Sequence, residues 1–289
     1  MSSELDAVVD RIVERVRARI QDDQAPPLPE VRGTWQDEAS ARLALTSGCD
    51  RLGLSGAEPL QSAPPRDLAR LIDHTLLKPT STRKDIERVC TEARKHGFAS
   101  VCVNTTWIGL VARLLDGSSV KPICVVGFPL GAMSIQGKAD ETRHAIAAGA
   151  DEIDMVLNIG ALKGGDYDTA LEDIRQVVAA SQGRPVKVIL ETAMLDRDEK
   201  IAASALCKAG GAAFVKTSTG FGGGGATVED IALIRAVVGP TMGIKASGGV
   251  RTAADIEALV AAGATRVGAS ASVAIVMGDA GTGSGSGGY

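Results

Sequence analysis

The sequence predicts a (β/α)8 barrel with an N-terminal helical extension. Two observations support this fold class. From residue 67 onward, short apolar segments alternate with longer segments in which apolar residues recur at helical spacing. In addition, a helix-ending glycine stands shortly before three of the strands, in AAGADEIDMVLN (147–158), KAGGAAFVKTST (208–219) and AAGATRVGAS (261–270).

Five further strands bring the expected total to eight, which fits residues 67–277 at the small end of the size range for such barrels. They are LIDHTLL (71–77), SVCVN (100–104), KPICVVG (121–127), VKVILE (186–191) and MGIKASG (242–248). Helical segments such as DTALEDIRQVVAASQG (168–183) separate the strands, which indicates parallel pairing with helical crossovers. The alternative is an open doubly wound sheet, but its typical GxGxxG first turn is absent.

Both ends of the chain differ from this pattern. Residues 1–66 contain an amphipathic helical segment, the breaker QAPPLPE and a second helical segment at about 37–46. We expect an extension that packs against the barrel or mediates self-association, with a loosely attached appendage as the alternative. At the other end, the composition of GDAGTGSGSGGY (278–289) predicts a flexible tail.

Composition restricts the possible partners and compartment. The net charge of -4 gives no reason to expect nucleic acid as a partner. No apolar run approaches the roughly 20 residues of a membrane-spanning helix, and no export signal is evident. The five cysteines form no CxxC pair, so we expect reduced thiols and a cytoplasmic protein.

Polar residues recur on one alternating face of five predicted strands. They are Asp73, Cys102 with Asn104, Asp154, Lys216 and Lys245. In a barrel, alternate residues point inward and chemistry occurs at the carboxyl ends of the strands. If these faces are the inward ones, two lysines, two aspartates, an asparagine and a cysteine meet in one cavity.

Two buried lysines with a carboxylate suggest covalent chemistry. Structural ion pairs are the alternative, but pairing requires only one residue of each sign. A free lysine has a pKa of about 10.4, and burial together with a second ammonium favours its neutral, nucleophilic form. One lysine would then form a Schiff base with a carbonyl substrate, the other would keep it deprotonated, and Asp154 would move protons.

Glycine-rich turns predict a phosphate site. ASGGVRT (246–252) follows the seventh strand and GASAS (268–272) the eighth, where barrels often bind phosphate through backbone amides. Arg251 is a candidate counter-charge at the rim, although a solvated surface arginine is the more common case. The three histidines form no ligand cluster, so we expect neither a metal nor another cofactor.

Several motifs resemble those of deoxyribose-phosphate aldolases, which are imine-forming aldolases with a (β/α)8 barrel. The matching segments cover residues 71–271 in order: IDHTLLKP, VCVN, GFPLG, EIDMVLNIGALKGGD, KVILET, FVKTSTGF, IKASGGVRT and RVGAS. The resemblance implies reversible cleavage of 2-deoxy-D-ribose 5-phosphate into D-glyceraldehyde 3-phosphate and acetaldehyde. The rival hypotheses are another Schiff-base sugar-phosphate aldolase and a sugar-phosphate binding protein without catalysis. Retention of both lysines and Asp154 argues against the second.

The resemblance also implies residue roles. Lys216 would form the Schiff base, Lys245 would be its electrostatic partner, Asp154 would transfer protons and Asp73 would support them. The remaining candidates are substrate-binding: Cys102, Asn104 and Thr217 in the cavity, and Gly220, Gly248, Gly249, Ala269 and Ser270 in the phosphate loops.

Three further expectations come from the family. Tyr289 is a candidate for proton transfer, because some members end in a mobile tail with a terminal tyrosine, although a tail without such a role is an equal alternative. The chain is expected to be a homo-oligomer, either a dimer or a tetramer. It departs from the family in having four glycines after STGF and no basic side chain there, so phosphate binding would depend more on backbone amides.

Overall fold

The computed structural model describes Arg11, Glu14 and residues 68–278. Arg11 and Glu14 are helical and exposed. Otherwise the predicted extension (1–66) lies outside the described residues, as does the predicted tail apart from Gly278. No helix in the described part of the chain is both long and apolar enough to cross a bilayer.

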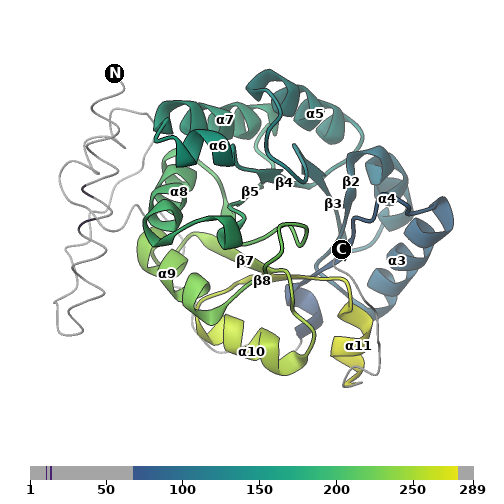
Figure 1. The fold of residues 1–289 in the computed structure, drawn as a ribbon. Coiled ribbons are helices and arrows are strands. Elements are labelled where there is room, and N and C mark those ends of the chain that lie inside the picture. The colour runs from purple at the N-terminus through teal and green to yellow at the C-terminus, as the bar shows by residue number, and fades with distance from the viewer. Residues whose placement is uncertain (1–10, 12–13, 15–67, 279–289) are drawn as a thin grey trace.

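Eight parallel strands close into a barrel, paired in sequence order from β1 to β8 and back to β1 (Figure 1). Their bounds are β1 Ile72–Leu76, β2 Ser100–Asn104, β3 Lys121–Val126, β4 Glu152–Val156, β5 Val186–Ile189, β6 Phe214–Lys216, β7 Gly243–Ser247 and β8 Arg266–Ala269. The predicted fold class is therefore confirmed, and the open-sheet alternative is wrong.

Helices surround the strands in the view down the barrel (Figure 1). The α-helices are α3 Arg83–His96, α4 Ile108–Leu115, α5 Ile135–Ala147, α6 Ile159–Lys163, α7 Tyr167–Ala180, α8 Arg197–Ala209, α9 Val228–Val238, α10 Ala253–Ala261 and α11 Ser272–Met277. Short 3-10 turns are η1 Leu68–Leu71, η2 Thr105–Trp107 and η3 Thr192–Met194. Helices α3, α8 and α10 each begin with a capping box, which satisfies amides that would otherwise be unpaired at the helix start.

Strand residues divide between two environments. One alternating set is apolar, with Ile153, Met155, Val188 and Ile244 among its members, and packs against the helices in one large core. The opposite set points into the barrel and carries most of the buried charged groups. This division gives every strand a firm outer anchor, so the inward side chains are held on a rigid scaffold.

A buried ion pair lies in the outer layer, behind the end of β4. Lys138 on α5 donates to Asp173 on α7 at 2.6 Å and to the carbonyl of Val156 at 2.8 Å. Both side chains of the ion pair are 0% exposed. Burial lowers the pKa of Lys138 and raises the pKa of Asp173, which shows that desolvation outweighs their mutual attraction.

Lys138→Met is expected to lower the free energy of unfolding by about 3–5 kcal/mol, because it leaves the Asp173 carboxylate buried without its partner. Replacing both residues, with Lys138→Met and Asp173→Leu, should recover most of this loss, since no charge then remains buried. Denaturant unfolding of the two single variants and the double variant measures the cycle. A double variant less stable than either single one would contradict this explanation.

Candidate active site

Asp154 on β4 stands at the centre of a cluster of buried charges inside the barrel. Its Oδ2 lies 2.8 Å from Nζ of Lys216 on β6 and 2.7 Å from Nζ of Lys245 on β7. Its Oδ1 lies 2.9 Å from Nζ of Lys187 on β5. One carboxylate thus contacts three lysines from three successive strands, which is possible only if all four side chains point into the lumen.

A second group of contacts lies beside the first. Asp73 on β1 is 2.6 Å from Lys245 Nζ and 2.7 Å from a guanidinium nitrogen of Arg266 on β8, and it accepts a hydrogen bond from Ser100. Glu152, two residues before Asp154, is 2.6 Å from Lys187 Nζ. Lys245 therefore joins two carboxylates, whereas Asp154 is the carboxylate that Lys216 contacts.

A glycine on β8 makes room for Lys245. A Cβ atom at Gly268 would lie 3.1 Å from Lys245 Cε and 3.0 Å from Ser247 Cβ, closer than ordinary van der Waals contact. Alanine at this position would push the Lys245 chain away from Asp73 and Asp154. The small residue is therefore part of the geometry of the cluster.

Among the described groups inside the lumen, the basic side chains outnumber the carboxylates by one. In the described part of the chain, the lumen holds four basic side chains, Lys187, Lys216, Lys245 and Arg266, and three buried carboxylates, Asp73, Glu152 and Asp154. Lys121, which is half-exposed, reaches Glu152 from the outer end. An uncompensated buried charge costs several kcal/mol, so one of the four cations is expected to be neutral.

Lys216 is the group that fits this requirement. Burial lowers its pKa, and the ammonium of Lys245 lowers it further, against the opposing effect of Asp154. Burial also disfavours the charged form of Lys245, but Asp154 and Asp73 raise its pKa well above the ordinary value. Lys187 behaves like Lys245, because neighbouring carboxylates overcome its burial and raise its pKa. Lys216 is thus the amine among the three with a depressed pKa.

Neighbouring cations lower the pKa values of Asp154 and Asp73 and so favour their ionised forms. Burial alone would raise the pKa of Asp154, but Lys187, Lys216 and Lys245 together hold it well below its usual range. The pKa of Asp73 is also lowered, because Lys245 and Arg266 outweigh its burial. Asp154 therefore accepts hydrogen bonds from Lys216 and Lys245 at once and connects the two amines.

The opposite wall of the lumen is apolar. Leu77, Cys102, Ile123 and Val125 form a small cluster inside the barrel, with Phe128 packed against it. Burial raises the pKa of the Cys102 thiol to about 11, so it remains protonated at neutral pH. Asn104 ends β2 and donates to the carbonyl of Leu77 at 3.1 Å. A small carbonyl compound at Lys216 would thus meet charge on one side and apolar groups on the other.

The predicted phosphate-loop residues cluster at the carboxyl ends of β6, β7 and β8. Gly220, Gly248 and Gly249 have positive φ values of 89°, 89° and 76°, which favour glycine. The carbonyl of Gly248 accepts from the amide of Ala226, which joins the β6–α9 and β7–α10 loops. Ser270 follows β8 and is exposed, whereas Ala269 ends β8 with its side chain in the outer core.

Two candidates remain, Thr217, which directly follows β6, and Tyr289. The Thr217 hydroxyl donates to the carbonyl of Ser247 and accepts from its amide, both at 3.0 Å, so it joins β6 to β7. Its contribution is to hold the strand end that follows Lys216. Tyr289 lies outside the described residues.

A protein-family model described as DeoC/LacD family aldolase matches residues 68–286. The chain belongs to this family. A deoxyribose-phosphate aldolase of Bacillus mycoides is 57% identical over 215 residues, covering 74% of this chain and 96% of the relative. A second one, from Halalkalibacterium halodurans, is 57% identical over 221 residues, covering 76% and 99%. A solved tetrameric deoxyribose phosphate aldolase from Aeropyrum pernix has a TM-score of 0.70 and 31% identity, covering 74% of this chain and 91% of that one.

Three members of this aldolase's charged cluster were missed by the sequence reasoning: Lys187, Glu152 and Arg266. A usable signal was present. Lys187 alternates with Ile189 on β5, Glu152 with Asp154 on β4, and Arg266 with Gly268 on β8. Counting by twos along every strand, and not only along those with a recognised motif, would have placed all three in the lumen.

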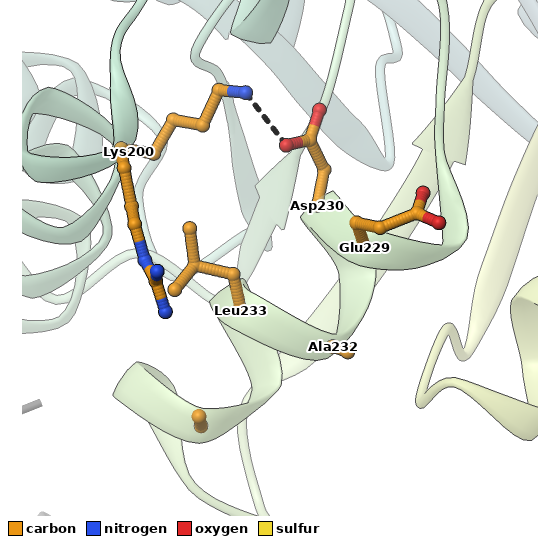
Figure 2. Close-up of a pocket in the computed structure, with 7 residues that line it drawn as sticks. Lys200, Glu229, Asp230, Ala232 and Leu233 are labelled. Carbon is orange, nitrogen blue, oxygen red and sulfur yellow. Dashed lines mark hydrogen bonds and ion pairs between the residues drawn. The ribbon is translucent and has the colours of Figure 1, made fainter. Parts of the chain in front are cut away.

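The aldolase also has a surface groove of about 480 Å³ on the outside of the barrel, between α8 and α9. Figure 2 shows Lys200 of α8 reaching Asp230 of α9, an ion pair of 2.7 Å. Ala232, Leu233 and Ala236 provide its apolar lining. The groove shares no residue with the charged cluster of the lumen, so it is separate from the candidate active site.

Other features bear on cofactors and redox state. Within residues 68–278, no group of three or more His, Cys, Asp or Glu side chains is arranged to hold a metal ion. The four described cysteines, Cys90, Cys102, Cys124 and Cys207, are buried and free, while Cys49 lies outside the described residues.

Proposed function

We propose that Lys216 performs the chemistry of this aldolase as a Schiff-base nucleophile. The chain is a deoxyribose-phosphate aldolase, which cleaves 2-deoxy-D-ribose 5-phosphate reversibly to D-glyceraldehyde 3-phosphate and acetaldehyde. The observation that carries the residue assignment is the depressed pKa of Lys216 within a buried cluster whose charges balance when that amine is neutral. A neutral amine is the form that attacks a carbonyl.

In the cleavage direction, Lys216 Nζ attacks C1 of the open-chain sugar, and loss of water from the carbinolamine leaves an iminium ion. Removal of the C3 hydroxyl proton breaks the C2–C3 bond. The electron pair of the broken C2–C3 bond forms the enamine, and C3 becomes the aldehyde carbon of glyceraldehyde 3-phosphate. Protonation of the enamine at C2 and addition of water to the resulting iminium ion release acetaldehyde and restore Lys216.

Asp154 and Lys245 are assigned to proton transfer and charge. Asp154 Oδ2 lies 2.8 Å from Lys216 Nζ and 2.7 Å from Lys245 Nζ, so it can accept a proton that leaves Lys216. Asp154 can therefore move protons during carbinolamine formation and collapse and at the enamine carbon. Lys245 stays an ammonium and disfavours protonation of Lys216, and Asp73 holds Lys245 in place.

The phosphate is assigned to backbone amides at the ends of β6, β7 and β8. Gly220 follows β6, Gly248 and Gly249 follow β7, and Ala269 and Ser270 stand at the end of β8. The β6–α9 loop contains no lysine. The glycines allow close approach of the backbone to an anion. Asn104, Thr217 and Cys102 are assigned to the wall around the rest of the substrate. Tyr289 remains a candidate for assisting proton transfer from the end of the chain.

Borohydride trapping tests the Schiff base. Incubation with acetaldehyde and sodium borohydride is expected to leave a stable two-carbon adduct on Lys216, located by peptide mass mapping. Lys187 and Lys245 serve as internal controls, because their raised pKa values keep them protonated and unreactive. An adduct on either of these lysines in place of Lys216 would refute the assignment.

Lys245→Met is expected to move the acid limb of the kcat/KM profile upward by about one pH unit or more, because Lys216 loses the neighbouring charge that depresses its pKa. The remaining Asp154 carboxylate acts in the same direction by favouring protonated Lys216. The half-exposed Lys163, which pairs with Glu199, provides the control Lys163→Met. If the acid limb of the Lys245→Met profile stayed at the wild-type pH, the proposed electrostatic effect of Lys245 on Lys216 would be refuted.

We also propose a homo-oligomer, either a dimer or a tetramer, and a cytoplasmic location. The tetrameric relative from Aeropyrum pernix supports the first, and the free, buried cysteines support the second. Light scattering on the full chain measures the oligomeric state.

A further inference from the structure

Glu191 adopts an unusual backbone conformation directly after β5. Its φ and ψ are 58° and 62°, in the left-handed region that favours glycine, and the residue is only 2% exposed. Non-glycine residues in this region cost free energy and persist where the surroundings hold them. The only other described non-glycine residue with positive φ is Gln182, in the turn after α7. The backbone strain at Glu191 must therefore be offset by favourable contacts of this residue.

The compensating contacts all come from the loop that follows Lys216. Both carboxylate oxygens of Glu191 lie 3.3 Å from the amide nitrogen of Thr219, and one of them accepts a hydrogen bond from the Thr219 hydroxyl. That hydroxyl in turn accepts from the amide of Phe221 at 2.9 Å. One carboxylate thus fixes the direction of two amides in the β6–α9 loop, directly and through Thr219.

The glycines of this loop fit closely around the same region. A Cβ atom at Gly222 would lie 2.5 Å from Glu191 Cδ, and one at Gly224 would lie 2.4 Å from Ala193 Cβ. On the other side, a Cβ at Gly225 would lie 2.4 Å from the carbonyl oxygen of Gly248. Three of the four glycines in this run, Gly222, Gly224 and Gly225, are therefore packed between the end of β5 and the β7–α10 loop.

This packing leaves donors available where a phosphate is assigned. Among the described residues, the amides of Gly220, Gly222 and Gly223 have no hydrogen-bond partner, whereas Thr219 and Phe221 use theirs within the Glu191 contacts. A carboxylate next to a phosphate site repels the ligand, and donors that engage its lone pairs weaken this repulsion. The Thr219 amide and hydroxyl engage them here.

We propose that Glu191 is a positioning residue for the phosphate of the substrate, acting through Thr219 to hold the β6–α9 loop with its free glycine amides in place. This role depends on the proposed function, because it presupposes a phosphorylated substrate at that loop. It assigns to a side chain that follows β5 the task of orienting a phosphate loop that itself has no basic residue.

The test compares 2-deoxyribose 5-phosphate with unphosphorylated 2-deoxyribose in two variants of the full chain. Glu191→Gln keeps the size of the side chain but places an amide against the Thr219 donors. Glu191→Gly removes the contacts and also relieves the backbone strain. In both, KM for the phosphorylated sugar is expected to rise about tenfold with little change in kcat, and kcat/KM for 2-deoxyribose to change less than about threefold.

Two controls separate this role from a structural one. Gln182→Gly relieves the same kind of strain far from the site, and Glu87→Gln changes an exposed carboxylate on α3; both should keep the wild-type preference for phosphate. Equal losses on both sugars, or full preference for phosphate in Glu191→Gly, would overturn the role of Glu191 alone. A wild-type enzyme with no preference for the phosphorylated sugar would overturn the phosphate assignment as well.

Discussion

Lys216→Met is expected to lower kcat/KM by at least about 10⁴-fold, because no other amine in the lumen is both depressed in pKa and able to form the imine. The fold should be retained. Methionine is close to lysine in size, and without Lys216 three basic side chains of the lumen face three carboxylates. Steady-state kinetics and thermal unfolding measure the two effects together.

Lys200→Met is the matched control for this variant. Lys200 lies in the surface groove of Figure 2, where it pairs with Asp230, and it has no contact with the lumen. Its loss should leave kcat/KM near the wild-type value. If Lys216→Met kept more than about one per cent of the activity, the covalent mechanism through this residue would be wrong.

Asp154→Asn is expected to produce the second large effect, a loss in kcat of about 10²- to 10⁴-fold. The amide cannot accept the proton that leaves Lys216, and it removes the carboxylate that bridges two amines. Stability should fall too, by about 3–5 kcal/mol, because buried Lys187 and Lys245 lose a counter-charge. Kinetics and denaturant unfolding separate the two consequences.

Glu152→Gln provides the control that distinguishes catalysis from charge balance. Glu152 is 1% exposed, lies on the same face of β4 and neutralises Lys187, but it has no contact with Lys216. Its loss should cost stability on a similar scale while kcat stays within about tenfold of the wild type. Equal losses of kcat in the two variants would assign Asp154 a purely structural role.

Much of the fold could be predicted because it depends on local patterns. Strand boundaries followed from short apolar segments between helical ones, and the predicted 100–104 strand matches β2 residue for residue. Helix starts are also local, because the capping boxes at Thr82 and Asp196 each involve residues within one four-residue segment. Alternation along a strand likewise assigns a residue to the lumen or to the outer core without knowledge of its partners.

Other features required the three-dimensional arrangement. Three of the four glycines after Phe221 are explained by close neighbours, Glu191, Ala193 and Gly248, that come from distant segments of the chain. Nothing in the local sequence ETAM marks Glu191 as left-handed, since its conformation depends on what Thr219 offers 28 positions later. The ion pair of Lys138 with Asp173 also joins two helices that a local reading treats separately.

The sequence by itself determined the barrel, the inward positions of Lys216, Lys245 and Asp154, and the type of chemistry that such residues permit. Only the tertiary structure decided which of the lysines has a lowered pKa. That outcome depends on the sum of charges from six strands, including the unforeseen Lys187, Glu152 and Arg266. The physical reason is that Coulomb interactions act over several ångströms in a poorly solvated interior, so the pKa of each group belongs to the whole cluster.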